Sequence, residues 1–325
     1  MRKGKLTQAA LARSVLRTLE KQQEDVVQYP AYGCGYGAFR SGGQITVTAC
    51  GSSAGFPKTA PEFSVHEACG HLLEACAEPV GVTLQLLLPE TYEEAELKKQ
   101  MKLLDEAAGI YGAAVLGGHT EVTDRVAGPL VSVTAFGKAE KLPPEAEPEQ
   151  DLILAGSVAS FAAAKLAEVR RTQLAGHFSE SFLHDVEEMG KERMLPAAVR
   201  ILQKDGALPM KAAGRGGIFA ALWEMAEHAH LGIDVELKRI PIRQETIEIC
   251  EYFSLNPYQL FCSDTLLAAV PDGARAVREL AGQNIPAAVI GRTMAGKERI
   301  LRNGEEIRYL DKPQTDEWYR AEEQE

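Results

Sequence analysis

Hydrophobic and polar positions follow two periods along the chain, one typical of helices and one typical of strands. Helical spacing of apolar residues predicts helices over residues 65–77, 91–109, 158–169, 218–229, 242–253 and 274–282, and an earlier one capped by Thr7. Strand-like runs occupy residues 44–50, 82–88, 113–116, 130–136, 152–154, 234–240, 265–270 and 287–290. The order of these elements lacks the regular strand–helix alternation of a doubly wound sheet. It favours an α+β fold with antiparallel or mixed sheets.

The chain is long enough for two domains, because 325 residues provide two separate hydrophobic cores. A Pro- and Glu-rich stretch at residues 141–150 is the predicted linker. We therefore expect one domain over residues 1–145 and a second over residues 146–325. The polar residues 316–325 are expected to fray.

Composition and charge narrow the class of protein. With 45% hydrophobic and 25% charged residues, the chain is typical of a globular protein. Its formal charge of -11 argues against nucleic-acid binding, which needs clustered Lys and Arg. We expect no membrane span and no signal peptide, because every apolar run is short. The six cysteines lack the regular spacing of a disulfide framework, so we expect reduced thiols and a cytoplasmic location.

Six segments in the same order along the chain match motifs of one enzyme superfamily. They are residues 4–6 with 30–33, then 45–50, 67–79, 116–121, 215–217 and 240–260. Together they resemble the aminoimidazole ribonucleotide (AIR) synthetase superfamily, which includes thiamine-monophosphate kinase and selenophosphate synthetase. The closest likeness is to its hydrogenase maturation factors, the carbamoyl dehydratases. The resemblance covers nearly the whole chain.

The resemblance implies an AIR-synthase-like two-domain fold. Its N-terminal domain has a mixed sheet, contains the ATP site and forms a homodimer with its twofold mate, and its C-terminal domain is an α+β sandwich. In the family, metal ions held by aspartates neutralise the phosphates of ATP, as expected for hard cations with oxygen ligands. The likeness to the maturation factors also implies a maturation-protein partner.

The positions of the family's metal carboxylates hold other residues in this chain. The paired acids of the first loop are replaced by Cys34 and Gly35, and the acid that ends the following strand by Cys50. The Asn-Asp of the next helix is replaced by Gly70 and His71. We therefore do not expect Mg-ATP to bind in the usual way. The dehydratases also use a C-terminal cysteine, whereas this chain ends Ala-Glu-Glu-Gln-Glu, so their reaction is not expected in its usual form.

Three of those positions thus hold a thiol or an imidazole. A fourth is His119, which stands where the family has the Asp of a Gly-Gly-Asp-Thr loop. Imidazole and thiolate suit zinc, iron or nickel better than magnesium. One hypothesis is therefore a transition-metal site formed by Cys34, Cys50, His71 and His119. The alternative is that these are small buried cysteines and histidines of a solvated helix face.

Two glycine-rich segments are candidates for binding a phosphate through backbone N–H groups. The first is Gly117, Gly118 and Thr120. The second is Arg215, Gly216 and Gly217, where the guanidinium adds a bidentate donor. In the alternative interpretation both are turns needed for tight packing.

No nucleophile–base–acid constellation is evident, so no catalytic residue is assigned. Three functions stay open. The first is a maturation-factor-like protein with lost or altered ATP-dependent activity and a rebuilt Cys/His site. The second is an active ATP-dependent synthase or dehydratase acting on a carbonyl or phosphate-accepting group. The third is a non-catalytic dimeric scaffold.

Overall fold

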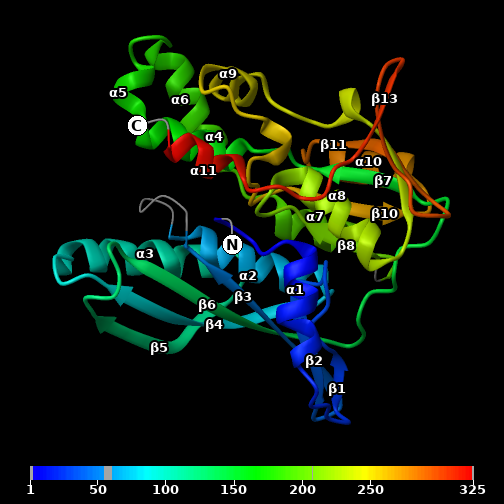
Figure 1. The fold of residues 1–325 in the computed structure, drawn as a ribbon, viewed down its shortest axis with the longest axis horizontal. Coiled ribbons are helices and arrows are strands. Elements are labelled where there is room, and N and C mark those ends of the chain that lie inside the picture. The colour runs from blue at the N-terminus through cyan, green and yellow to red at the C-terminus, as the bar shows by residue number, and fades with distance from the viewer. Residues whose placement is uncertain (1–2, 55–60, 207, 324–325) are drawn as a thin grey trace. The chain divides into compact units, whose positions relative to one another are not determined.

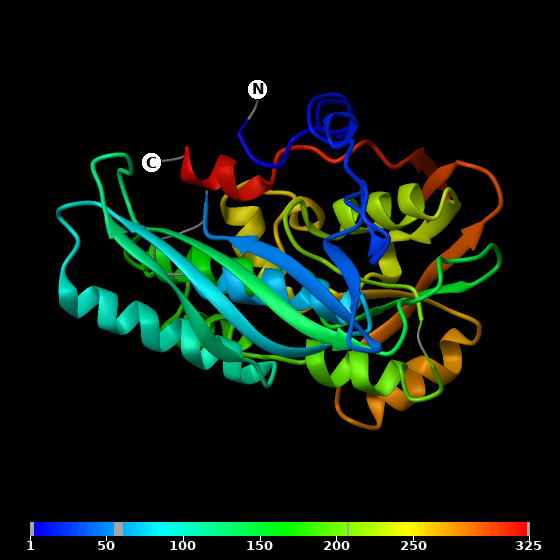
Figure 2. The same ribbon diagram turned by 90° about the horizontal axis from the view of Figure 1, so that it is seen from below.

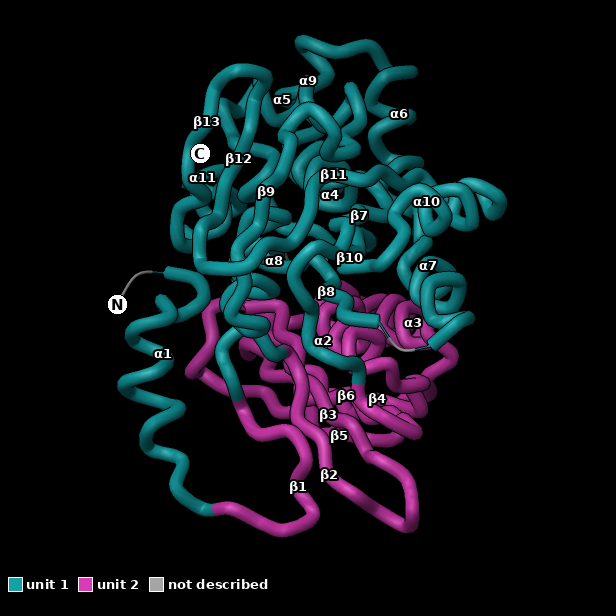
Figure 3. Tube along the Cα trace, turned by 90° about the vertical axis from the view of Figure 1, so that its right-hand side faces the viewer, with its two compact units in different colours: residues 1–21, 31–34, 143–325 teal, residues 22–30, 35–142 magenta. Residues whose placement is uncertain are grey.

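The computed structural model describes residues 3–54, 61–206 and 208–323, and the chain divides into two compact units (Figure 3). Unit 1 comprises residues 1–21, 31–34 and 143–325, and unit 2 comprises residues 22–30 and 35–142. The change of unit between residues 142 and 143 lies close to the proposed linker. Two early segments, however, cluster with the C-terminal half.

Unit 2 contains one six-stranded sheet with helices on one face (Figures 1 and 2). Its strand order is β1-β2-β3-β6-β4-β5, and only the β4/β5 pair is parallel. The strands are β1 (Val26–Gln28), β2 (Tyr36–Ser41), β3 (Gln44–Ser52), β4 (Glu78–Leu88), β5 (Ala114–Val122) and β6 (Leu130–Ala139); the helices are α2 (Phe63–Glu74) and α3 (Glu94–Ile110).

Helix α2 approaches strand β3 very closely, and one glycine makes this possible. A Cβ atom at Gly51 would lie 2.0 Å from the Ser64 carbonyl oxygen of α2. Neighbouring side chains of a strand point to opposite faces of the sheet. Gly51 therefore faces α2, and the exposed side chain of Cys50 points away from it.

Unit 1 contains a seven-stranded sheet of order β13-β12-β9-β11-β7-β10-β8, in which only β12/β9 is parallel. Its strands are β7 (Asp151–Ala155), β8 (Met210–Ala212), β9 (Gly232–Glu236), β10 (Leu266–Val270), β11 (Ala287–Met294), β12 (Arg299–Asn303) and β13 (Glu306–Tyr309). Its α-helices are α1 (Gln8–Ser14), α4 (Ser160–Val169), α5 (Arg171–Leu174), α6 (Glu180–Met189), α7 (Leu195–Leu202), α8 (Gly217–His228), α9 (Gln244–Tyr252), α10 (Gly273–Ala281) and α11 (Glu317–Glu322). Short 3-10 turns lie at Leu16–Thr18, Leu237–Arg239 and Pro257–Gln259.

Strand β7 is buried on both faces, because helices pack on each side of the seven-stranded sheet. Leu152 and Leu154 share a buried hydrophobic cluster with Ile218 and Leu222 of α8. Helix α10 also packs on β7 and contacts α7, which packs on β10. The α+β expectation and the mixed sheets are confirmed.

Some local elements differ from the predictions. Strand β2 was not predicted, and it pairs with β3 through a tight turn at Gly42 and Gly43, both with positive φ. The segment at 116–121 is the interior of β5 and not a loop. Helices α6 and α7 and the β12/β13 hairpin were missed.

The C-terminal segment expected to fray forms α11, capped by Asp316 and anchored by the buried Trp318. Residues 324–325 of that segment lie outside the described part of the chain. No helix in the described ranges is long and apolar enough to cross a membrane.

Candidate functional site

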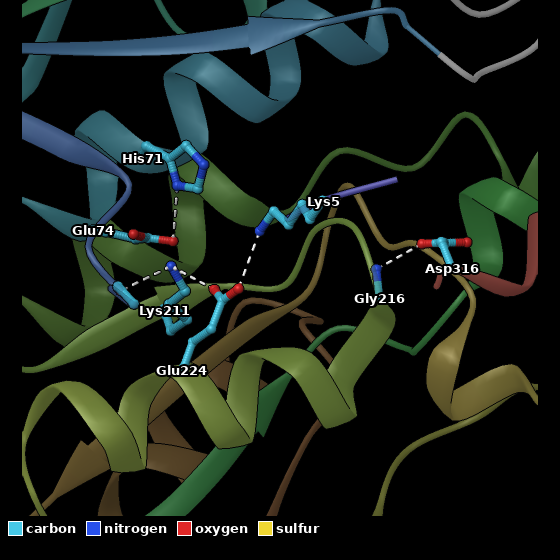
Figure 4. Close-up of polar contacts among 8 residues, drawn as sticks. Lys5, His71, Glu74, Lys211, Gly216, Glu224 and Asp316 are labelled. Atoms are coloured by element: carbon cyan, nitrogen blue, oxygen red, sulfur yellow. Dashed lines mark hydrogen bonds and ion pairs between the residues drawn. The ribbon is translucent and has the colours of Figure 1, made fainter. Parts of the chain in front are cut away.

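His71 of α2 is held by a buried acid (Figure 4). Its Nδ1 atom lies 3.1 Å from Oε1 of Glu74, one turn along the same helix. The His71 side chain is 14% exposed and that of Glu74 is 3% exposed. A carboxylate in this position favours the tautomer with the proton on Nδ1, and it leaves Nε2 as an acceptor or metal ligand.

The ring of His71 also fills the place of a side chain at position 35. A Cβ atom at Gly35 would lie 2.2 Å from Nδ1 of His71. The sequence comparison assigned acids to both positions in the family. The structure therefore places one proposed ligand, His71, against Gly35, and one imidazole fills the space between them.

Cys50 and His119 do not join His71 within unit 2. Cys50 lies on the sheet face opposite α2, and its Sγ is 3.7 Å from Oγ1 of Thr134 on β6. His119 lies on the edge strand β5 and is 63% exposed, and its Nε2 lies 3.0 Å from Oε2 of Glu121. Strands β6 and β4 lie between β3, which carries Cys50, and β5, which carries His119. Three spacings of roughly 4.8 Å separate the backbones of β3 and β5 by about 14 Å.

Cys34, the fourth predicted ligand, is half-buried, forms no disulfide and lies at the end of the 31–34 segment of unit 1. Within residues 3–54, 61–206 and 208–323, no group of three or more His, Cys, Asp or Glu side chains is placed to hold a metal ion. The four-residue transition-metal site therefore stays a prediction from sequence. Within unit 2, Cys50, His71 and His119 do not come together to form it.

Gly117, Gly118 and Thr120 lie within strand β5, and Gly118 has a packing role there. A Cβ atom at Gly118 would lie 1.9 Å from the Leu84 carbonyl oxygen of the neighbouring strand. The two strands shift register next to this point, between Val82 and Thr83. Gly118 is therefore required for the close pairing of β4 with β5.

The turn at Arg215, Gly216 and Gly217 binds a carboxylate through its backbone, and this carboxylate is the side chain of Asp316. The Gly216 N–H, at the start of α8, donates to Oδ2 of Asp316 at 2.6 Å (Figure 4). Oδ1 of the same carboxylate accepts from the N–H groups of Trp318 and Phe261. Asp316 is buried, and its burial raises its pKa to about 6 against the opposing effect of these hydrogen bonds.

A buried acid between two lysines ties the N-terminal segment to α8 in unit 1. Glu224 accepts from Nζ of Lys5 at 3.1 Å and pairs with Nζ of Lys211 at 3.3 Å (Figure 4). Lys211 also donates to the Gly33 carbonyl at 3.2 Å. Burial alone would raise the pKa of Glu224, but the two lysines outweigh it and lower the pKa to about 2. This network explains why residues 1–21 and 31–34 cluster with the C-terminal half.

Sequence reasoning missed Asp316 and Glu224. Asp316 had a usable signal, because an Asp two residues before a Trp at the start of an amphipathic segment is typical of a helix cap. The helical spacing of Glu74, three residues after His71, indicates from the sequence that it can support the ring. The role of Glu224 depends on lysines distant in sequence, and no local pattern shows them.

Similar proteins agree with this architecture. A carbamoyl dehydratase HypE from Rhodobacter capsulatus is 28% identical over 223 residues, which cover 67% of this chain and 65% of the relative. The structure of the hydrogenase maturation protein HypE in complex with ATP superposes with a TM-score of 0.70 at 16% identity, covering 96% of both chains. A chain in the crystal structure of the HypE–HypF complex gives a TM-score of 0.69 at 18% identity, covering 85% of this chain and 93% of that one.

Two family models cover most of the sequence. The N-terminal domain model of AIR synthase related proteins matches residues 46–139, and the C-terminal domain model matches residues 147–302. The fold predicted from the six motifs is confirmed. The chain belongs to the AIR synthase related family.

Proposed function

We propose that this chain is a hydrogenase-maturation-type member of its family in which the usual Mg-ATP chemistry is lost or altered. The observation that carries the proposal is the His71–Glu74 pair packed against Gly35, at positions where the resemblance implies magnesium carboxylates. A triphosphate needs hard cations with oxygen ligands, and an imidazole does not supply them.

The replacement is organised, which favours an altered site over random erosion. The residue that would clash with the ring is a glycine, and the acid that orients the ring is buried. An imidazole whose Nδ1 is held by a carboxylate is suited to metal binding or proton transfer through its other nitrogen. We therefore infer that His71 is the central residue of the altered first-domain site.

The test combines elemental analysis with a calorimetric titration of Mg-ATP into the untagged full chain. The proposal predicts no nucleotide binding at concentrations that saturate an ordinary ATP site. Stoichiometric zinc, iron or nickel would add support for the Cys34, Cys50, His71 and His119 set, with ligands contributed by more than one chain. Tight Mg-ATP binding would overturn the proposal and favour the ATP-dependent enzyme. Binding of neither a metal nor Mg-ATP would favour the non-catalytic scaffold.

Two partners belong to the same proposal. A homodimer through the N-terminal domain is favoured by apolar side chains exposed on β4 and β5, namely Val80, Leu116 and Val122, with β5 forming an open sheet edge. A maturation-protein partner is supported by the similarity to a chain in the crystal structure of the HypE–HypF complex. Light scattering of the purified chain tests the dimer, and a monomer at micromolar concentration would contradict it.

A further inference from the structure

Strand β13 is an open edge of the seven-stranded sheet of unit 1 (Figures 1 and 3). It runs from Glu306 to Tyr309, and all four residues are exposed. Among the described residues, only β12 pairs with it, and β13 ends the strand order of the sheet. The outer side of an edge strand carries N–H and C=O groups that can pair with a strand of another chain.

The hydrogen bonds of the β12/β13 hairpin determine which backbone groups point outward. The Leu310 N–H donates to the carbonyl oxygen of Arg299 at 2.7 Å, which makes these residues a hydrogen-bonded pair. Hydrogen-bonded and non-hydrogen-bonded pairs alternate along an antiparallel ladder. In the register of the hairpin, Arg308 is therefore hydrogen-bonded to β12, and Ile307 and Tyr309 are not. The N–H and C=O groups of Ile307 and Tyr309 consequently point to the open side of the strand.

Large apolar side chains stand at the same two positions. Ile307 is 57% exposed and Tyr309 is 65% exposed. Leu301, which lies opposite Arg308, shares a buried hydrophobic cluster with residues of α8. Since successive side chains of a strand alternate between faces, Ile307 and Tyr309 point to the face away from α8. Edges that avoid pairing usually carry charges, whereas the two outward positions of β13 carry Ile and Tyr.

The other two side chains of β13 carry opposite charges. Glu306 and Arg308 are both exposed, and they lie two positions apart on the same face of the strand. Each residue of an added antiparallel strand lies directly opposite one residue of β13. An acid opposite Arg308 and a base opposite Glu306 are favourable, whereas like charges in those places are destabilising.

A second copy of β13 does not meet these requirements. Both outward residues form hydrogen bonds to the copy only in the register that pairs Ile307 with Tyr309, and that register places two Arg308 side chains opposite each other. The register centred on Ile307 separates the arginines. However, it places Tyr309 opposite Glu305, which lies in the hairpin turn. The edge therefore fits a separate extended segment better than it fits a copy of itself.

We propose that β13 is a strand-addition site for a partner protein. The partner contributes an extended segment with two apolar residues opposite Tyr309 and Ile307. An acid between them lies opposite Arg308, and a base after them lies opposite Glu306. The backbone hydrogen bonds provide binding, and the alternating side chains provide selectivity. The site does not rest on the function proposed above, because all its residues lie in unit 1 and none takes part in the His71 site.

The experiment titrates a capped peptide, Thr-Val-Glu-Val-Lys-Thr, into the full chain and follows the backbone amide signals by NMR. Bound antiparallel, the peptide places its Glu opposite Arg308 and its Lys opposite Glu306. Saturable binding is expected, with slower hydrogen exchange at the amides of Ile307 and Tyr309. The swapped peptide Thr-Val-Lys-Val-Glu-Thr has the same composition and should bind about fivefold or more weakly.

Exchange of the two charges on β13 tests the register. The double variant Glu306→Arg, Arg308→Glu should prefer the swapped peptide by about the same factor. Arg200→Glu, at an exposed position of α7, reverses the same charge elsewhere in unit 1 and should leave the preference unchanged. If the double variant kept the wild-type preference, the proposed pairing would be wrong.

Tyr309→Pro tests the backbone contact. Proline removes the outward N–H of residue 309 and no hydrogen bond to β12, so the hairpin should remain folded. Binding should be about three- to tenfold weaker than in Tyr309→Thr, which loses the same ring but retains the N–H. Equal affinities of these two variants, or no saturable peptide binding to the wild-type chain, would overturn the proposal. Concentration-dependent protection of the Ile307 amide without peptide would assign the edge to a second copy, which also contradicts it.

Discussion

The imidazole of His71 occupies the volume that any side chain larger than hydrogen would need at position 35. The two residues lie in different elements of unit 2, one in α2 and the other immediately before β2, and their contact is 2.2 Å from Nδ1 to the position of an added Cβ. The glycine and the histidine therefore depend on each other sterically.

Gly35→Ala tests this coupling directly. The added methyl group must displace the ring from Glu74, and overpacking of this kind costs about 1–3 kcal/mol of stability. The same substitution in a His71→Ala background should cost at least about 1 kcal/mol less, because the ring is absent. Urea denaturation of the four proteins of the cycle measures the coupling. Strictly additive effects would show that the ring simply moves aside.

The sequence was sufficient for the fold because its evidence is distributed over the whole chain. Apolar periodicity located α3, α8, α9 and α10, and the motif order identified the family without any single strong motif. The hairpin strand β2 was missed because glycines dominate the segment before it. The second half of strand β5 was mistaken for a loop because Gly118 serves strand pairing with β4 and not a turn.

The candidate site was only partly predictable. The contact of His71 with Gly35 was not predicted, because the proposed metal site takes Cys34 as its ligand from the first loop. The separation of Cys50 from His71 depends on which face of β3 points to α2, and a one-residue offset reverses that face. The Asp316 contact joins residues 100 positions apart, so the glycine turn gave no sign that its acceptor was internal.

Lys5 and Lys211 should differ in their importance to unit 1, although both contact Glu224. Lys211 is 6% exposed and Lys5 is 48% exposed. Lys211→Met removes one of the two positive charges that offset the buried Glu224 carboxylate, and it should lower the free energy of unfolding by about 3–5 kcal/mol. Lys5→Met, at a half-exposed pair, should cost about 1 kcal/mol or less. Equal losses of unfolding free energy in the two variants would contradict this ranking.

Acid should weaken unit 1 through Glu224. Its pKa is about 2 in the fold, below the ordinary value of 4.5, because the two lysines outweigh burial. A lowered pKa contributes stability above pH 4.5, and this contribution is lost as the pH falls from 4.5 towards 2. The difference corresponds to about 3 kcal/mol. In Glu224→Gln the unfolding free energy should be lower at pH 6 and should fall less steeply below pH 4.5.

Asp316 should have the opposite effect in a higher pH range. Burial raises its pKa to about 6 from an ordinary 3.8, so the folded state binds this proton more tightly than the unfolded state does. Its ionisation therefore costs stability as the pH rises from 3.8 to 6, by at most about 3 kcal/mol.

Asp264 has the same direction of shift, with a pKa raised to about 6 by burial, so the wild-type slope between pH 4.5 and 6.5 contains both carboxyls. Asp316→Asn should reduce the slope of unfolding free energy against pH by about half, because one of the two titrating carboxyls is removed. It should also lower stability at every pH, because the N–H groups of Gly216 and Trp318 donate to different carboxylate oxygens and an amide has only one oxygen. Urea denaturation at pH 4.5, 5.5 and 6.5 measures the slope. The matched control Asp205→Asn, at a surface ion pair with Arg275, should leave it unchanged. An unchanged slope in Asp316→Asn would mean that the Gly216 turn holds this carboxylate ionised throughout the range.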